Sequence, residues 1–223
     1  MNYLDIFDNA KVWIKYVHFL NKKYYKNDFL EVGAGIGSFT DNYKERIKNI
    51  FLTEVDKNNL SILKDKYKNN LNIRVLDKEV GDIEEQFNTI AHFNVLEHIK
   101  EDKKEIYNCL NKINQNGYLV ILVPAHNKLY SKLDKDVGHY RRYDKSFFKE
   151  LDLKGNDIVE LKYVDCLGYL LYYLNKIFFK DETYPSNFKI FVWDKIFTPF
   201  TIIFDFITGY KIGKNILCVI KKK

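Results

Sequence analysis

A short apolar run near the N-terminus leads into three glycines that suit a cofactor with a nucleotide-like shape. Residues 29–32 include Glu31 and are followed by Gly33, Gly35 and Gly37. Glycine lets the backbone turn sharply and approach a ligand closely, because no Cβ intervenes. A helix that begins after such a turn offers free N–H groups at its N-terminus. The pattern predicts a strand, a glycine turn and a helix that together hold a cofactor.

Acidic residues also follow the next strand-like run, residues 50–55. Glu54 lies near the end of this run and Asp56 just beyond it. A carboxylate can accept hydrogen bonds from both hydroxyls of a ribose. Both residues are candidates for this role, and the alternative is that they are solvated acids in a loop.

Histidines and arginines supply the candidates for acceptor chemistry. Histidine can take a proton near neutral pH, and the candidates are His98, His126 and His139. His98 and His139 rank equally as the catalytic base, and either is alternatively a structural histidine. Arg141 and Arg142 suit a phosphate or carboxylate.

The region around the two arginines offers other contacts for an acceptor. One arginine could instead pair with an acid of its own loop, the candidates being Asp134, Asp136 and Asp144. A wall for the acceptor is expected from three tyrosines and His126, the tyrosines being Tyr130, Tyr140 and Tyr143. The three cysteines are widely spaced without a C-x-x-C pair, so free buried thiols are expected and no metal site.

Several other chemistries are disfavoured by what the sequence lacks. A dinucleotide fingerprint G-x-G-x-x-G that starts at Gly33 would need glycine at position 38, where the chain has Ser38. The sequence contains no G-x-S-x-G elbow, H-E-x-x-H pair or phosphate-binding G-x-x-x-x-G-K-[ST] loop. A nicotinamide oxidoreductase is therefore a weak alternative.

The pattern E-x-G-x-G-x-G at residues 31–37 resembles motif I of the class I S-adenosylmethionine (SAM) methyltransferases. The resemblance implies that Glu31 helps to hold the methionine end of SAM. It also implies that the loop of Gly33, Ala34, Gly35 and Gly37 passes under the cofactor. The second strand ends in Glu54, Val55 and Asp56, which resembles family members in which the first acid binds the ribose. The resemblance therefore favours Glu54 over Asp56.

Two further segments carry the resemblance. An acid after the third strand often contacts the adenine in this family, and Asp77 is the candidate here, with Asp82 as the alternative. The hexapeptide N-V-L-E-H-I at 94–99 resembles the motif after strand four of one branch, which implies that Asn94 and Val95 face the methyl donor. Asn88 departs from that branch, which usually has aspartate there.

The segment 123–143 is the most distinctive part of the chain. It resembles the V-P-A…G-H-x-R-R-Y signature of methyltransferases found beside, or fused to, glycosyltransferases of surface-glycan pathways. The resemblance covers nearly the whole chain. It is specific for the cofactor fold and carries little information on the acceptor.

Alternating helix and strand patterns between residue 28 and about 165 predict a parallel sheet with crossover helices. The resemblance implies an α/β, Rossmann-like sheet of seven strands whose last strand is antiparallel. The expected strands are 28–32, 50–55, 72–76, 88–94, 118–123, 157–164 and 215–220. We expect a single domain over 1–223, which includes an N-terminal helical cap at 1–27 and a helical insert at 167–214.

The insert is rich in aromatic residues, and its run 190–207 is apolar. It nevertheless holds Asp194, Lys195 and Asp205. Each charge would cost about 2.5–3.5 kcal/mol at the centre of a bilayer. No membrane span is therefore expected, and two amphipathic helices remain, which either pack on the domain or a second copy, cover the substrate as a lid, or rest on a membrane.

Composition limits the partners and the compartment. The net charge is +6 but the lysines are spread among acids, so no nucleic-acid groove is expected. The cysteine pattern fits a cytoplasmic protein, and so does the absence of a basic segment followed by an apolar one at the N-terminus. The alternative is a cytoplasmic protein that is bound at the inner face of the membrane.

The leading hypothesis is a SAM-dependent methyltransferase that acts on oxygen or nitrogen of a small or glycan-type acceptor. The arginines favour an anionic acceptor, and the resemblance implies a surface-polysaccharide or glycolipid pathway. The alternatives are a non-catalytic SAM-binding partner subunit and an RNA methyltransferase.

Overall fold

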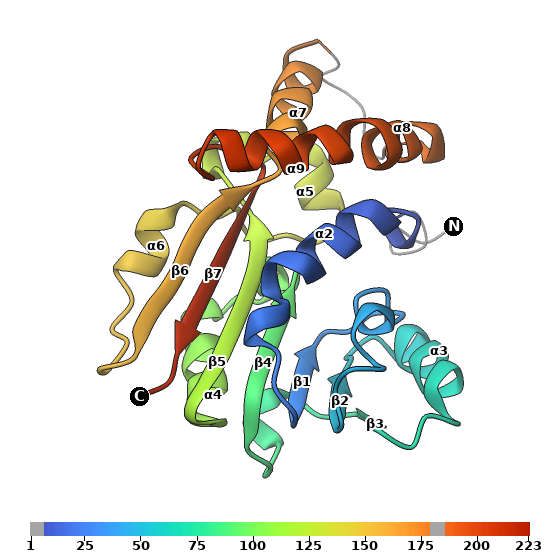
Figure 1. The fold of residues 1–223 in the computed structure, drawn as a ribbon, viewed down its shortest axis with the longest axis vertical. Helices are drawn as coiled ribbons and strands as arrows, with labels where there is room; N and C mark the ends of the chain where they lie inside the picture. The colour runs from blue at the N-terminus through green and yellow to red at the C-terminus, as the bar shows by residue number, and fades with distance from the viewer. Residues whose placement is uncertain (1–6, 179–185) are drawn as a thin grey trace.

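The computed structural model describes residues 7–178 and 186–223, and Figure 1 shows a single twisted sheet with helices on both faces. The strand order is β3-β2-β1-β4-β5-β7-β6. β7 runs antiparallel to both of its neighbours, whereas β1 to β5 pair in parallel. The predicted seven-stranded sheet with an antiparallel last strand is confirmed. The strands are β1 Phe29–Val32, β2 Ile50–Thr53, β3 Ile73–Leu76, β4 Phe87–Phe93, β5 Ile113–Pro124, β6 Asp157–Val164 and β7 Asn215–Lys221.

The helices divide between the two faces of the sheet. The α-helices are α2 Lys11–Asn21, α3 Lys57–Tyr67, α4 Asp102–Asn111, α5 Lys132–Asp136, α6 Lys145–Lys149, α7 Cys166–Phe178, α8 Asn187–Val192 and α9 Thr198–Ile207. The short 3-10 turns are η1 Lys22–Tyr24, η2 Thr40–Asn42, η3 Val80–Asp82, η4 Leu96–His98 and η5 Asn127–Leu129, and η6 Trp193–Phe197 is a π-helical turn. Apolar residues of α2 and α3 share one buried cluster with the sheet. Those of α4 and α6 share the other.

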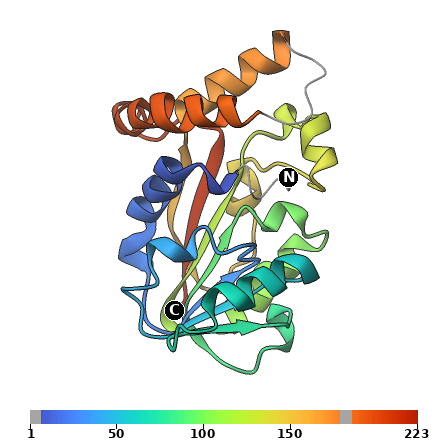
Figure 2. The same cartoon turned by 90° about the vertical axis from the view of Figure 1, so that its right-hand side faces the viewer.

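The insert packs against the N-terminal helix, as Figures 1 and 2 both show for α2 and the segment from α8 to α9. The carboxylate of Asp194 accepts the backbone N–H groups of Val12 at 3.1 Å and Trp13 at 2.8 Å. These are first-turn donors of α2, which has no side-chain cap of its own. Asp194 therefore caps a helix that lies far away in the sequence.

A second buried acid of the insert, Asp205, also accepts hydrogen bonds from distant segments of the chain. Asp205 accepts the Tyr16 hydroxyl at 2.9 Å, and the backbone N–H groups of Asp165 at 2.8 Å and Cys166 at 2.9 Å. Asp194 and Asp205 are the acids that the sequence analysis used against a membrane span, and both are fully buried. Within 7–178 and 186–223, no helix is long and apolar enough to cross a membrane.

We predict that Asp194→Ala lowers the free energy of unfolding by about 1–3 kcal/mol, because two buried N–H groups of α2 lose their acceptor. Urea denaturation followed by circular dichroism would measure this. Asp157→Ala is the matched control, since Asp157 pairs with Lys223 at the surface. An equal, small loss in both variants would contradict the capping role.

Candidate functional site

A cavity of about 1000 Å³ lies beyond the carboxyl ends of β1, β2 and β4. In open α/β sheets this is the edge at which ligands bind. The insert closes the cavity from the opposite side: Tyr172, Trp193 and Phe197 belong to its lining. Figure 2 shows the helices of the insert lying across this end of the sheet. The insert is therefore one wall of the cavity.

The glycine loop forms the floor of the cavity. Gly33, Gly35 and Gly37 all have positive φ, at 64°, 58° and 81°. A Cβ on Gly33 would lie 2.8 Å from the Val95 side chain, and one on Gly37 would lie 2.5 Å from the Tyr67 hydroxyl. Gly33, Ala34 and Gly35 line the cavity, whereas Gly37 lies outside the lining and packs against Tyr67. Glycine is thus required at both ends of the turn.

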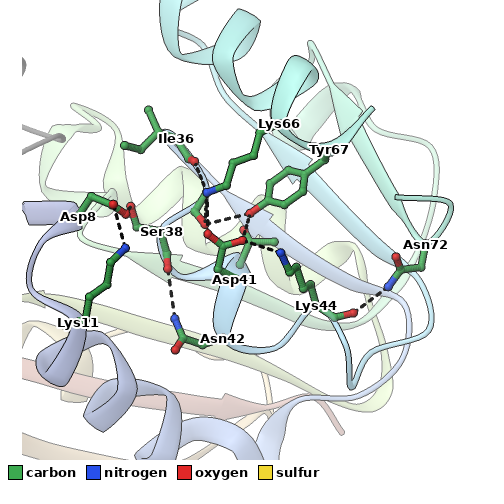
Figure 3. Close-up of polar contacts among 12 residues, drawn as sticks. Asp8, Lys11, Ile36, Ser38, Asp41, Asn42, Lys44, Lys66, Tyr67 and Asn72 are labelled. Atoms are coloured by element: carbon green, nitrogen blue, oxygen red, sulfur yellow. Dashed lines mark hydrogen bonds and ion pairs between the residues drawn. The ribbon is translucent and has the colours of Figure 1, made fainter. Parts of the chain in front are cut away.

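Side chains of α3 hold the loop in place. Figure 3 shows Lys66 and Tyr67 pointing toward the loop, where the Lys66 ammonium donates to the carbonyl of Ile36 at 2.9 Å. Tyr67 donates to the Gly37 carbonyl at 3.0 Å, and Lys66 pairs with Asp41 at 2.7 Å. The loop is therefore a braced element of the site.

The helix predicted directly after the glycine turn is absent, and that part of the prediction was wrong. Only the 3-10 turn Thr40–Asn42 occurs in this stretch. The N–H of Ala34 donates to the carbonyl of Thr53 at 2.8 Å, and the N–H of Gly35 donates to Glu54 at 2.8 Å. The donors expected at a helix N-terminus are thus occupied, and carboxylates carry the polar recognition at this end of the cavity.

Glu31 is a buried carboxylate in the wall of the cavity. It is 2% exposed and accepts hydrogen bonds from the hydroxyls of Thr40, at 2.6 Å, and Tyr43. Burial raises the pKa of Glu31 to about 7, and the two hydroxyl donors only partly offset this. A cation in the cavity would favour the ionised form.

The structure distinguishes Glu54 from Asp56. Both line the cavity. Glu54 accepts the N–H of Gly35 with one oxygen and the N–H of Asp56 with the other, each at 2.8 Å. Asp56 caps α3, accepting the N–H groups of Asn58 at 3.0 Å and Asn59 at 2.9 Å. The backbone fixes the Glu54 carboxylate and leaves further lone pairs for hydroxyl donors.

Asp77 lies outside the cavity lining. Its carboxylate pairs with the Lys57 ammonium at 3.1 Å, with both side chains exposed to solvent. Asp82, the alternative for the adenine contact, is also outside the lining. Asn94 and Val95 do line the cavity, and Asn94 has a φ of 55°, which turns the chain at the end of β4.

Both candidate catalytic histidines lie on the same wall of the cavity. The rings of His98 and His139 meet edge to face, with centroids 4.6 Å apart. His98 is partly open to the cavity, but desolvation by the surrounding protein and the neighbouring His139 lower the pKa of His98 to about 4, so His98 is neutral at pH 7. Nδ1 of His139 lies 2.9 Å from an oxygen of Asp134.

Glu97 also lines this wall, and sequence reasoning missed it. Its carboxylate is 1% exposed, and neither oxygen has a hydrogen-bond partner. Burial raises the pKa of Glu97 to about 8. The residue stands inside the N-V-L-E-H-I motif, directly before His98, so a carboxylate adjoining a candidate histidine was the available signal.

Asp134 organises the same wall. Besides His139 it accepts the Ser131 hydroxyl at 2.9 Å and the Nε–H of Arg142 at 2.9 Å. These donors outweigh burial and hold the pKa of Asp134 well below its usual range. The Arg142 guanidinium lies over the Tyr172 ring at 4.3 Å, and its Nη1 has no hydrogen-bond partner. Arg142 thus lines the cavity and has a buried donor without a partner.

The other acceptor candidates lie outside the cavity lining and support its loops. Arg141 pairs with Asp102 at 2.5 Å, and the Tyr143 hydroxyl donates to Asp102 at 3.0 Å. Tyr130 donates to the carbonyl of His139 at 2.6 Å.

Two further acceptor candidates are placed in the same way. His126 stacks on Tyr163, and its Nε2 lies 2.9 Å from the carbonyl of Gly213. Tyr140 is 56% exposed. Of the residues predicted to bind the acceptor, as distinct from the catalytic histidines, Arg142 lines the cavity and the other five do not.

Comparisons with known proteins agree on the architecture. A family model described as a methyltransferase domain matches residues 7–154. No curated protein matches the chain. A SAM-dependent methyltransferase from Clostridium acetobutylicum is similar, with a TM-score of 0.60 and 15% identity over 100% of this chain and 92% of the other.

Two other solved structures are similar. The N-methyltransferase NodS from Bradyrhizobium japonicum, solved with S-adenosylhomocysteine (SAH), has a TM-score of 0.59 and 12% identity over 93% of this chain and 84% of NodS. The YcgJ protein from Bacillus subtilis has a TM-score of 0.62 and 11% identity over 94% of this chain and 98% of YcgJ. At these identities the likeness shows the fold.

Proposed function

This chain belongs to the methyltransferase-domain family and is a SAM-dependent methyltransferase, and we propose that its acceptor is a small or glycan-type molecule with an anionic group. One observation carries the proposal. A single cavity joins the glycine loop and Glu54 on one side to His98, His139 and Arg142 on the other. Such a cavity can hold a cofactor and an acceptor side by side.

The residues present fit SAM. The volume of about 1000 Å³ is at the upper end of small-molecule sites. We assign the ribose hydroxyls to Glu54 and the ammonium of the methionine end to Glu31, while Asn94 and Val95 form the wall beside the sulfonium. When bound, SAM supplies a methyl group on a positively charged sulfur. The protein's part is to hold the acceptor atom in line with it.

Arg142 supports an anionic acceptor, because it lines the cavity and its buried guanidinium has a donor without a partner. We predict that Arg142→Gln raises the KM for the acceptor by about 10–100-fold, which corresponds to the loss of one charge-assisted hydrogen bond. Steady-state kinetics with a phosphorylated sugar or anionic glycolipid that the parent methylates would measure the change in KM. Arg141→Gln is the matched control, since its guanidinium pairs with Asp102 outside the lining. Equal KM changes in both variants would contradict the assignment.

We assign to His98 and His139 the contact with the reacting group of the acceptor. We predict that His98→Ala and His139→Ala each lower kcat by about 100-fold or more, the range typical of a catalytic side chain, while SAH still binds. Single-turnover methyl transfer and SAH calorimetry would separate the two effects. His18→Ala is the control, because His18 is outside the lining. Full activity in either cavity variant would refute its role.

The outer face of the insert supports peripheral contact with a membrane that carries a glycolipid acceptor. Among the described residues of the insert, exposed apolar side chains include Phe191, Ile196, Phe200, Ile203, Phe204, Phe206 and Ile207. The inner face of the same helices lines the cavity, so an acceptor at a membrane surface would lie close to its site. Co-sedimentation with anionic vesicles would support this, and a dimer in analytical ultracentrifugation without vesicle binding would assign the face to a second copy.

The proposal is tested by incubating the pure protein with labelled SAM and three acceptor classes. We expect methylation of phosphorylated sugars or anionic glycolipids, and none of RNA or protein. Methylation of RNA with a steep salt dependence would replace the proposal by the nucleic-acid alternative. SAH binding with no methylation of any acceptor would favour a non-catalytic partner subunit.

A further inference from the structure

We propose that Glu97, His98 and His139 bind a divalent metal ion, of the zinc or manganese kind, in the acceptor half of the cavity. The ligand atoms of these three side chains all lie within 4.8 Å of one another. One carboxylate and two imidazoles form a donor set that suits such ions. The inference rests on the proposed function only for what the ion would do.

The distances fit an ion after small side-chain rotations. Nε2 of His139 lies 3.9 Å from an oxygen of Glu97. In a tetrahedral site with bonds of about 2.0–2.2 Å, two ligand atoms lie about 3.4 Å apart. The two atoms are too far apart for a hydrogen bond and close enough to share a cation.

The unpartnered Glu97 carboxylate is the second, independent observation. Both of its oxygens are buried and have no hydrogen-bond partner. A buried carboxylate without a donor is costly, and the cost disappears when a cation binds it. Arg142 is the nearby cation in the lining, and no hydrogen bond or ion pair joins it to Glu97, since its Nε bonds to Asp134.

Asp134 orients His139 as a metal ligand requires. A ligating histidine usually donates its other ring N–H to a carboxylate, which sets the tautomer and turns a lone pair toward the metal. Nδ1 of His139 is 2.9 Å from Asp134, and its Nε2 is the atom that faces Glu97. With Nδ1 protonated, the lone pair on Nε2 of His139 faces the Glu97 carboxyl group across 3.9 Å, where one cation could be bound by both.

Three protein ligands leave coordination positions open for an oxygen of the acceptor. A bound cation lowers the pKa of a coordinated hydroxyl. The site therefore favours a hydroxyl acceptor, whose proton would pass to solvent as its oxygen takes the methyl group, and His98 and His139 would act on it as ligands of the ion. The acceptor's own anionic group would still be free to contact Arg142.

The test is calorimetry of the full chain, stripped with a chelator, with Zn²⁺ and Mn²⁺ each alone. We expect the parent to bind one ion, and Glu97→Gln and His98→Ala to weaken binding by more than about 100-fold. Asp134→Asn should weaken it by about 10–100-fold, as expected for a partner that orients a ligand. Glu101→Gln and His18→Ala are matched controls outside the cavity and should bind as the parent does.

SAH binding, measured on every variant, shows that each one is folded. A parent that binds neither ion, or a Glu97→Gln variant that binds as tightly as the parent, would overturn the proposal. SAH binding and methyl transfer in a parent that binds no metal would do the same and leave the proposed function standing. Metal binding that is lost in both ligand variants would support the site even if no acceptor were methylated.

Discussion

Glu54→Ala is expected to weaken SAH binding by about 100- to 1000-fold. The substitution removes the two oxygens assigned to the ribose hydroxyls, and charge-assisted hydrogen bonds contribute about 1.5–3 kcal/mol each. It also removes the acceptor of the Gly35 N–H, which positions the glycine loop. Calorimetric titration with SAH measures the change, and NAD serves as the ligand that should not bind.

Asp56→Ala is the matched control for this experiment. Asp56 also lines the cavity, but its oxygens are engaged by the first turn of α3. We expect this variant to lose about 1 kcal/mol of folding stability while SAH affinity stays within a few-fold of the parent. If Glu54→Ala binds SAH as tightly as the parent, the ribose assignment is wrong.

Glu31→Gln is expected to stabilise the unliganded protein at pH 8 by up to about 3 kcal/mol while it weakens SAH binding. Burial raises the pKa of Glu31 from 4.5 to about 7, which corresponds to about 3 kcal/mol at 1.36 kcal/mol per pKa unit. Glutamine keeps an acceptor for the hydroxyls of Thr40 and Tyr43 and carries no charge.

The pH dependence gives this prediction its sign. Between pH 4.5 and about 7 the folded state binds more protons than the unfolded state, so parental stability falls as pH rises through this window. Below pH 4.5 both states are protonated, and the advantage of the variant should disappear. Urea denaturation from pH 4 to 8 would show the two curves diverging.

Glu45→Gln is the control for the stability curves, because Glu45 lies at the surface of the same segment. It should follow the parent at every pH. If Glu31→Gln also follows the parent, the carboxylate of Glu31 costs the fold nothing. An unchanged SAH affinity in Glu31→Gln would remove the ammonium assignment.

The strands and the insert were predictable because their signals are local. The buried strands read as apolar runs that end in polar or glycine residues, as Phe29–Val32 does. Asp194 and Asp205 were the local signal for the prediction that the apolar run of the insert does not span a membrane. Their roles as caps of α2 and α7 could not be predicted. The backbone N–H groups that they accept, such as those of Trp13 and Cys166, lie far from them in the sequence.

The candidate site was predicted in part. Glu31, Gly33, Glu54 and Asn94 belong to motifs at strand ends, and parallel strands bring those ends together. Arg141 and Arg142 are adjacent and chemically identical, so no local pattern separates them. Asp102 and Asp134 separate the two arginines. Asp102 pairs with Arg141 outside the cavity lining, and Asp134 pairs with Arg142 within it.

The sequence by itself determined the sheet, the glycine turn, the acid within β1 and the acid that follows β2, because these depend on the types and spacing of neighbouring residues. Only the tertiary structure decided that the glycine turn leads to no α-helix, since Lys66 and Tyr67 of α3 brace the loop instead. Only it joined Glu97 and His98, which follow β4, to His139, which Asp134 of α5 orients. Side chains of distant segments select among the conformations and partners that the local sequence leaves open.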